Sequence, residues 1–241
     1  MRVHVIQQVD FEGPALIAEW AEERGHELSC GLALTEEYPA CETVDMLVLM
    51  GGPMDADDEV ANPWLHAEKR FVADCIAAGH PVLGVCLGAQ ILAEVLGGEV
   101  RRNPEKEIGW YTVEKTEFGE AEPMFADWPT SAVVGQWHGD TFDLPAGLEA
   151  LYSSEACPNQ AFVFDHRVVG LQFHIEWTKA SLARLINACR AELGNGAMWV
   201  MSPTELEDEA PERIAANRVM LFALLDRLRA EDGPEPSEPA Q

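Results

Sequence analysis

The segment from residue 81 to residue 90 places the tightest limit on how this chain can fold. An apolar run at 81–85, typical of a buried strand, leads into a Gly-x-Cys-x-Gly pattern centred on Cys86 and then into a helical pattern. A strand that turns so sharply into a helix needs small residues two positions before and after the turn, and Gly84 and Gly88 meet that need. We therefore predict a nucleophile elbow with Cys86 at its tip.

An elbow of this kind gives Cys86 the properties of a candidate nucleophile. The residue would start a helix, where the helix dipole and free N–H groups favour a thiolate. The next N–H group, that of Leu87, can point at an oxyanion. Taken alone, the pattern also fits a buried structural cysteine between two packing glycines.

Short apolar runs alternate with helical patterns over the first hundred residues. Such alternation predicts an α/β fold with a mostly parallel central sheet and helices on both faces. The predicted strands are Val3–Ile6, Glu27–Leu32, Met46–Met50 and Pro81–Val85, and the predicted helices are Pro14–Arg24, Pro63–Ala78 and Gly88–Leu96.

The pattern changes between residues 110 and 173, where strand-like pieces are separated by turn residues. We expect these pieces to complete the sheet with some antiparallel additions. They are Trp110–Lys115, Ala132–Trp137, Gln160–Asp165 and Val168–Phe173. Helical patterns resume at Lys179–Leu193 and Pro203–Arg229. Residues 1–230 are predicted to form a single domain, and the acidic, Pro-rich residues 231–241 a disordered tail.

The chain is strongly acidic, with 42 Asp and Glu residues against 16 Lys and Arg residues and a formal net charge of −26. Binding to nucleic acid or to an anionic membrane needs clustered positive charge, so this balance argues against both partners. The acidity itself has two readings, a well-solvated surface or adaptation to high salt. No apolar stretch approaches the roughly 20 residues that span a bilayer, and the chain opens on a strand-like run, so we expect a soluble, cytoplasmic protein.

Six cysteines are scattered along the chain without a Cys-x-x-Cys pair. Their spacing indicates neither a disulfide framework nor a zinc site, and we expect reduced thiols and no bound metal or cofactor. The five cysteines outside the elbow are interpreted as core or inert surface residues: Cys30, Cys41, Cys75, Cys157 and Cys189.

A thiolate nucleophile needs a base, and the base needs a group that orients it. Of the seven histidines, His174 is followed two residues later by the carboxylate of Glu176. In an extended segment residues i and i+2 face the same side, so Glu176 can hold one ring nitrogen while the other meets Cys86. A single His-x-Glu pattern is weak evidence for a catalytic pair, but its combination with an elbow cysteine is stronger evidence.

A glycine pair, Gly51-Gly52, follows the predicted strand Met46–Met50. Ligands of open parallel sheets bind beyond the carboxyl ends of the strands, where both this loop and the Cys86 elbow would lie. A backbone N–H from Gly52 or Gly51 can complete an oxyanion hole with that of Leu87. The alternative is an ordinary turn at the end of a strand.

Five segments carry a resemblance to a known family: Gly51-Gly52-Pro53, residues 84–90, Trp137-His138-Gly139-Asp140, residues 158–162 and Phe173-His174-Ile175-Glu176. Together they resemble the triad-type, class I glutamine amidotransferases, in particular the amidotransferase portion of GMP synthetase and its stand-alone relatives. The resemblance covers most of residues 1–195 and implies a flavodoxin-like sheet. One departure is Ile175, where the family usually has proline, and this position carries no chemistry.

Carried over residue by residue, the resemblance implies Cys86 as nucleophile, His174 as base and Glu176 as the group that orients the base. It implies Gly52 and Leu87 as the donors of the oxyanion hole.

The resemblance also implies substrate contacts from Gly51, Gln90, Trp137 and His138. His138 has a second reading, in which it only hydrogen-bonds Asp140 and stiffens a turn.

The implied activity is hydrolysis of the glutamine side-chain amide through a thioester, with an unidentified acceptor for the ammonia. The chain contains neither a GxxxxGK[ST] loop nor the Ser-Gly-Gly-x-Asp-Ser nucleotide loop of the GMP synthetase partner. A separate synthetase subunit is therefore one expected partner. Two alternatives stay open, a stand-alone hydrolase of γ-glutamyl peptides or amines, and a non-catalytic glutamine-binding or regulatory subunit.

Overall fold

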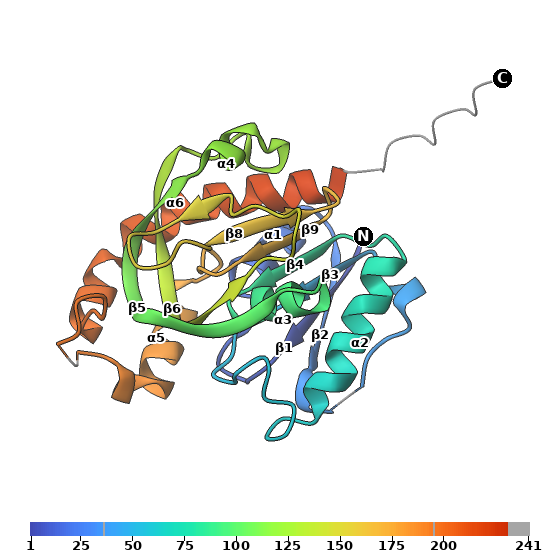
Figure 1. Ribbon diagram of the computed structural model, residues 1–241, viewed down its shortest axis with the longest axis horizontal. Helices are drawn as coiled ribbons and strands as arrows, with labels where there is room; N and C mark the ends of the chain where they lie inside the picture. Colours follow the sequence, from blue (N-terminus) through green and yellow to red (C-terminus); the bar gives the residue numbers. More distant parts are fainter. Residues whose placement is uncertain (36, 195, 231–241) are drawn as a thin grey trace.

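The computed structural model describes residues 1–35, 37–194 and 196–230, and these fold around one nine-stranded sheet. The strands are β1 Arg2–Gln7, β2 Glu27–Leu32, β3 Met46–Leu49, β4 Val82–Val85, β5 Glu99–Lys115, β6 Ser131–Asp143, β7 Tyr152–Ser153, β8 Ala161–Phe164 and β9 Val168–Leu171. The α-helices are α1 Leu16–Glu23, α2 Trp64–Ala77, α3 Leu87–Val95, α4 Glu117–Ala121, α5 Lys179–Ala188 and α6 Pro203–Ala230. Across the sheet the strands run in the order β2-β1-β3-β4-β9-β8-β7-β5-β6 (Figure 1).

One half of the sheet, from β2 through β1, β3 and β4 to β9, is parallel. Strands β3 and β4 are buried along their whole length because helices cover both of their faces. In the registers of β4 with its neighbours, Leu49 lies opposite Gly84 and Leu171 opposite Val85. The segments that follow β3, β4 and β9 therefore emerge at one edge, where ligands of parallel sheets bind.

The other half of the sheet, from β9 through β8 and β7 to β5 and β6, is antiparallel. This confirms the expected antiparallel additions, and β5 and β6 form a long two-stranded ribbon. Strand β5 begins at Glu99, whereas the predicted strand begins at Trp110. The prediction missed the first half of β5 because this half is mostly exposed, includes Pro104 and lacks an apolar alternation. The pairing of β5 with β6 shifts register between Arg102 and Glu107.

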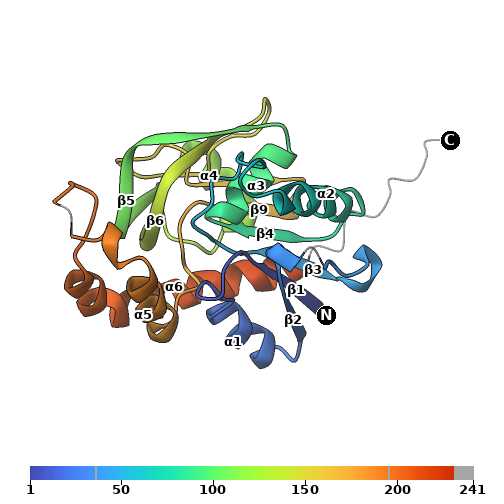
Figure 2. The ribbon, with the colours of Figure 1, turned by 90° about the horizontal axis from the view of Figure 1, so that it is seen from below.

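Helices cover the two faces of the sheet, as Figure 2 shows, with α2 and α3 on one side and α1 and α6 on the other. The alternating side chains of the strands meet these layers separately. Val5 packs in one core cluster with Trp20 of α1, whereas Ile6 packs in another with Leu65 of α2. The α/β architecture with helices on both faces is thus confirmed.

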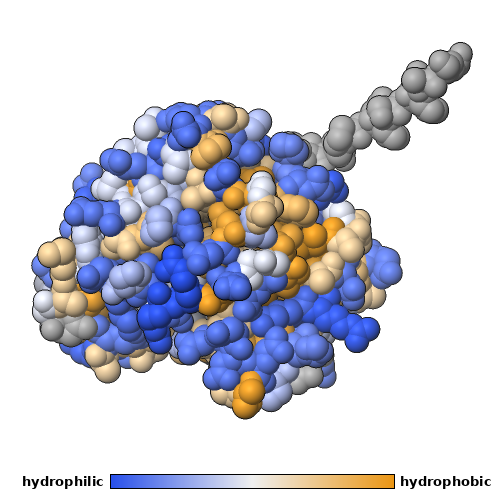
Figure 3. Space-filling view, in the orientation of Figure 1, coloured by the Kyte–Doolittle hydropathy of each residue, from blue (hydrophilic) through white to orange (hydrophobic). Residues whose placement is uncertain are grey.

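The helix predicted over Lys179–Leu193 ends at Ala188 and continues as a short 3-10 turn, Arg190–Glu192. The predicted tail at 231–241 lies outside the described residues, and the assignment of 1–230 to a single domain stays a prediction. Hydrophilic residues cover much of the face shown in Figure 3, in keeping with the acidic composition. Among the described helices, none combines the length and apolar character needed to cross a membrane.

Candidate active site

Cys86 lies at the turn between β4 and α3, directly before the first residue of the helix. Its φ of 52° is in the left-handed region, a strained conformation for a residue that carries a side chain. A Cβ atom on Gly84 would lie 2.5 Å from the carbonyl oxygen of Gly88, and one on Gly88 would collide with the carbonyl of Leu49. Close backbone packing thus requires both glycines, and the predicted elbow is confirmed.

The Cys86 thiol is largely buried beside polar groups. Its Sγ atom lies 3.6 Å from the main-chain oxygen of Trp137 and 3.7 Å from Nε2 of Gln172. The side chain also lies at the N-terminal end of α3, where the helix dipole stabilises negative charge. The site therefore combines a strained backbone with a setting that suits a thiolate.

The predicted base, His174, follows β9 and is buried beside its predicted partner. Its Nδ1 lies 2.7 Å from Oε1 of Glu176, and its ring stacks on Trp177 with centroids 4.7 Å apart. Two main-chain hydrogen bonds with Gly135, of 3.0 and 2.7 Å, fix His174 to β6. A Cβ atom on Gly135 would collide with the ring of Trp177, so the stack depends on a glycine at this position.

The second ring nitrogen of His174, Nε2, is buried without a conventional hydrogen-bond partner among the described residues. Burial by itself lowers the pKa of His174, but the Glu176 carboxylate and the adjacent Cys86 thiol outweigh it and raise the pKa well above its ordinary value. The imidazole therefore favours its protonated form between a carboxylate and a thiol.

The glycine loop after β3 reaches the same edge of the sheet. A Cβ atom on Gly51 would lie 3.2 Å from Cε1 of His174 and would collide with the carboxylate of Glu12. A Cβ atom on Gly52 would lie 3.1 Å from Cδ2 of Leu87. The structure thus brings Gly52 against the side chain of Leu87.

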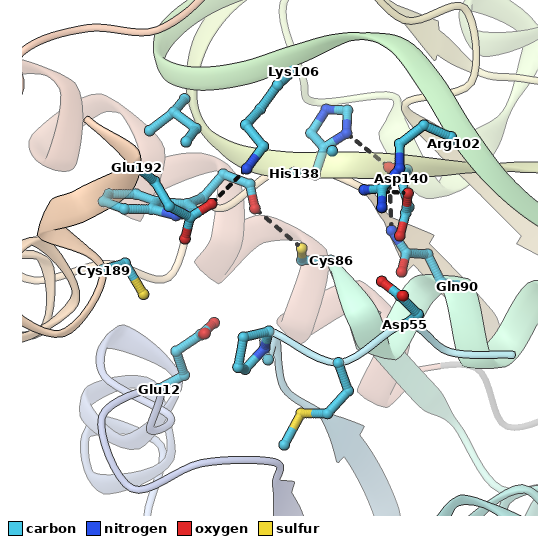
Figure 4. A pocket seen from close by; sticks show the side chains of 16 residues that line it. Glu12, Asp55, Cys86, Gln90, Arg102, Lys106, His138, Asp140, Cys189 and Glu192 are labelled. Carbon is cyan, nitrogen blue, oxygen red and sulfur yellow. Dashed lines mark hydrogen bonds and ion pairs between the residues drawn. The ribbon is translucent and has the colours of Figure 1, made fainter. Parts of the chain in front are cut away.

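A cavity of about 120 Å³ opens in front of Cys86. Of the residues predicted for the site, five line this cavity and the others lie behind or beside them. The lining residues are Gly52, Cys86, Gln90, Trp137 and His138. Charged side chains form two groups on opposite sides of Cys86, as Figure 4 shows.

The first charged group contains Asp55, Arg102 and Asp140 together with Gln90 (Figure 4). Arg102 makes an ion pair of 2.9 Å with Asp140, and Nε2 of Gln90 donates to the main-chain oxygen of Asp140 at 3.2 Å. Burial and the neighbouring Asp55 carboxyl raise the pKa of Asp140, against the opposing effect of Arg102. This side of the cavity offers positive and negative charge close together.

The second charged group contains Glu12, Lys106, Cys189 and Glu192 (Figure 4). Lys106 makes an ion pair of 2.6 Å with Glu192. Burial, Glu192 and Glu12 raise the pKa of the Cys189 thiol to about 11, which keeps Cys189 protonated and agrees with its interpretation as an inert thiol. Burial also raises the pKa of Glu12, to about 7.

His138 lines the cavity, but both of its ring nitrogens are already bonded. Nδ1 lies 2.8 Å from the main-chain oxygen of Asp140, and Nε2 lies 3.0 Å from the fully buried carboxylate of Glu107. The ring is therefore not free to bind a substrate through a nitrogen atom. The hydrogen bond to Asp140 is the contact that the second reading of His138 expected, but both residues lie within strand β6, so the predicted turn is absent and the bond stiffens a strand.

Glu107, His138 and Cys157 offer ligand atoms within 4.8 Å of one another and could in principle hold a metal ion. Hydrogen bonds already engage this group, because Glu107 also accepts from Ser154 and from Gln160, at 2.8 and 2.9 Å. These contacts fit a buried hydrogen-bonded network better than a metal centre.

Several cavity residues carry no signal in the sequence. They come from four separate segments without a motif. One of these segments is the first half of β5, which the sequence does not predict as a strand. These cavity residues are Glu12, Asp55, Arg102, Lys106 and Glu192. Hydrophobic periodicity locates buried elements, and it cannot identify charged side chains that the fold gathers around a cavity.

The fold and the elbow define a known class of protein. The profile of the family "Glutamine amidotransferase class-I" matches residues 17–186, and the chain belongs to this family.

Similar proteins support the same assignment. The chain is 34% identical over 213 residues to the glutamine amidotransferase-like protein YfeJ of Salmonella typhimurium, covering 86% of this chain and 89% of that protein. It is 32% identical over 184 residues to the GMP synthase [glutamine-hydrolyzing] of Vibrio atlanticus, covering 73% of this chain. The match spans only about a third of that synthase, 34% of its length.

Solved structures show the same fold. A glutamine amidotransferase from Thermotoga maritima superimposes with a TM-score of 0.88 at 34% identity, covering 95% of this chain and 98% of that one. A glutamine amidotransferase from Methylobacillus flagellatus gives a TM-score of 0.87 at 28% identity, covering 100% and 98% of the two chains.

Proposed function

We propose that this chain hydrolyses the side-chain amide of glutamine, or of another γ-glutamyl compound, through a thioester on Cys86. The observation that carries the proposal is the juxtaposition of a strained cysteine at a helix N-terminus with a buried His174–Glu176 pair. A thiol, a polarised imidazole and an orienting carboxylate are the parts that nucleophilic catalysis needs. A protein that only bound glutamine would need none of the three.

In the first half of the proposed reaction, the Cys86 thiolate attacks the side-chain carbonyl carbon and forms a tetrahedral intermediate. The main-chain N–H groups of Gly52 and Leu87 stabilise its oxyanion, and one such donor is typically worth about 2.7–4 kcal/mol of barrier. His174, protonated because its pKa is raised, gives a proton to the amide nitrogen. The C–N bond breaks, and ammonia or an amine leaves with a thioester behind it.

In the second half, a water molecule loses a proton to the now neutral His174 and attacks the thioester carbon. The C–S bond breaks, glutamate is released, and Cys86 regains its thiolate. Glu176 holds the imidazole throughout by its 2.7 Å contact with Nδ1, which leaves Nε2 for the proton transfers.

Substrate contacts are proposed from the cavity wall that Gln90 and the Trp137-His138 segment provide. Both ring nitrogens of His138 are bonded within the protein, so we assign the contact at this position to the main chain. Gly51 contributes by leaving room between the loop and His174, since a Cβ atom there would crowd the ring.

The destination of the ammonia is proposed from the relatives. GMP synthases that hydrolyse glutamine match this chain over about a third of their length, so a separate synthetase subunit is a candidate partner. Direct release of the product, without a partner, is the alternative for a γ-glutamyl hydrolase.

Glutamate release from a panel of γ-glutamyl amides tests the proposed function. We expect hydrolysis by the wild-type chain and loss of glutamate release in Cys86→Ala, with an unchanged melting temperature. Cys30→Ala is the matched control, because Cys30 is exposed and remote from the site, and it should keep full activity. Full activity in Cys86→Ala would refute the proposal.

A further inference from the structure

We infer that the leaving group preferred at this site is an aliphatic amine with a second, positively charged group, and that Glu12 recognises that charge. The inference rests on the proposed function and names the class of γ-glutamyl amide that the cavity selects. Its argument comes from the side on which the leaving group departs and from the charge that it meets there.

The direction of departure follows from the proton donor. The leaving nitrogen takes its proton from His174, so it must leave on the His174 side of Cys86. Glu12 lies on that side, since one point, the Cβ position of Gly51, is 3.2 Å from Cε1 of His174 and 3.4 Å from the carboxyl carbon of Glu12. Whatever is attached to the leaving nitrogen therefore approaches the Glu12 carboxylate.

The cavity wall across Cys86 from Glu12 carries both signs of charge. The γ-glutamyl group keeps an ammonium and a carboxylate at its α-carbon, and the Asp55–Arg102–Asp140 group offers both complementary charges beside Gln90. This wall suits the glutamyl part of the substrate. The Glu12 wall is then available to the leaving group.

The Glu12 wall carries unbalanced negative charge. Lys106 is paired with Glu192 at 2.6 Å, and within the described part of the chain Glu12 forms no ion pair with a lysine or an arginine. Burial, opposed by His174 and reinforced by Glu176 and Glu192, raises the pKa of Glu12 to about 7. Glu12 is half-buried at the cavity wall, and the neighbouring His174 imidazolium only partly offsets the loss of hydration, so a ligand that brings a further positive charge stabilises its carboxylate.

Glu12 is held in place by its surroundings, so it is not a side chain on a loose loop. The side-chain amide of Gln7 donates to the main-chain oxygen of Glu12 at 3.4 Å, and the N–H of Leu16 donates to the main-chain oxygen of Glu176 at 2.9 Å. Between them Ala15 adopts a strained φ of 43°. Such strain persists only where the surrounding contacts fix the backbone, here beside the predicted catalytic residues.

Three substrates of matched chain length test the inference at about pH 8, where Glu12 is mostly ionised. They are γ-glutamyl-diaminobutane, γ-glutamyl-pentylamine and γ-glutamyl-aminopentanoate, whose amine parts end in an ammonium, a methyl and a carboxylate group. We expect kcat/KM for the cationic amide to exceed that for the neutral one by about tenfold or more, as for a charged hydrogen bond, and the anionic amide to be the poorest. Equal values for the cationic and neutral amides would overturn the inference.

Variants assign the preference to Glu12. In Glu12→Gln we expect the ratio of the cationic to the neutral kcat/KM to fall to near one, whereas Asp10→Asn, an exposed carboxylate of the same loop, should keep the wild-type ratio. A ratio that persists in Glu12→Gln would contradict the role of Glu12. Should Glu12→Gln not fold, added salt must lower the ratio in the wild-type chain, and a ratio independent of salt would count against the inference.

The failures of the inference and of the proposed function are distinguishable. Hydrolysis of all three amides at equal rates would refute only the inference. Hydrolysis that survives Cys86→Ala would refute the thioester reaction, and the inference would then be decided by binding. Competition between the amides should then show a lower inhibition constant for the cationic amide than for the neutral one, and equal constants would overturn the inference.

Discussion

Two buried histidine–glutamate pairs lie at the edges of the same cavity, and they differ in what is left for chemistry. His174 uses one ring nitrogen to contact Glu176 at 2.7 Å, and its other nitrogen faces the Cys86 thiol without a conventional bond in the described structure. His138 has one nitrogen on Glu107 at 3.0 Å and the other on a main-chain oxygen at 2.8 Å.

The difference shows that pairing with a carboxylate is not enough to make a histidine a candidate base. The parallel half of the sheet delivers His174 beside an elbow cysteine, with a ring nitrogen to spare. The antiparallel ribbon of β5 and β6 encloses His138 in a saturated network with Glu107. We therefore expect loss of the first pair to affect the rate of reaction, and loss of the second to affect stability and substrate affinity.

The largest effect is expected from His174→Ala. Without the imidazole, no group protonates the leaving nitrogen or activates the water molecule, and general acid–base catalysis typically contributes about 10²–10⁴-fold. Steady-state glutamate release should show a fall in kcat of this size in the folded variant, whose melting temperature should also fall because the buried Glu176 carboxylate loses its partner. A variant that kept more than a tenth of wild-type kcat would show that His174 is not the base.

A smaller effect, of a different kind, is expected from Glu107→Gln. The substitution breaks a buried pair and turns an amide donor toward the donors of His138, Ser154 or Gln160, so we expect a loss of about 3–5 kcal/mol in the free energy of unfolding. In the folded variant KM should rise more than kcat falls, because the cavity wall shifts and the Cys86 side does not.

Urea denaturation and steady-state kinetics measure the two quantities for Glu107→Gln. Glu105→Gln is the matched control, since Glu105 is an exposed carboxylate on the same strand. A kcat lowered as strongly as in His174→Ala, with no change in stability, would break the contrast between the two pairs.

The smallest effect concerns Glu12, a carboxylate with no histidine to hold it. Its folded pKa, about 7, lies above the usual value of 4.5, so the folded state binds more protons than the unfolded state between these values. Stability must therefore fall as pH rises from about 4.5 to 7, by at most about 3 kcal/mol from this group. Glu12→Gln should unfold at a higher temperature than the wild type at pH 8 and at a similar temperature near pH 4.5. Equal differences at both pH values would contradict this assignment.

The parallel half of the molecule could be predicted from the sequence because its signals are local. The elbow at Cys86 needs small residues at fixed spacings, and close backbone packing at Gly84 and Gly88 explains why. His174 and Glu176 are two residues apart, so their proximity also follows from the extended backbone.

The charged and polar residues around the cavity could not be predicted in the same way. Glu107 and His138 are 31 positions apart, and Lys106 meets Glu192 across 86 positions, so only tertiary structure brings these pairs together. The first half of β5 carries Arg102 and Lys106 but is largely exposed, and without an apolar alternation it has no strand signal. Sequence motifs therefore located the predicted chemistry, and the fold was needed to find the charged walls around it.

The central claim, a nucleophilic Cys86 activated by His174, is tested most directly by labelling with a glutamine-like diazo-ketone. Peptide mapping of the labelled chain should place the adduct on Cys86, at a rate well above that of the exposed Cys30, with protection by glutamine or a γ-glutamyl amide. The labelling rate should collapse in His174→Ala. Labelling of Cys86 no faster than Cys30, or unaffected by His174→Ala, would contradict the account.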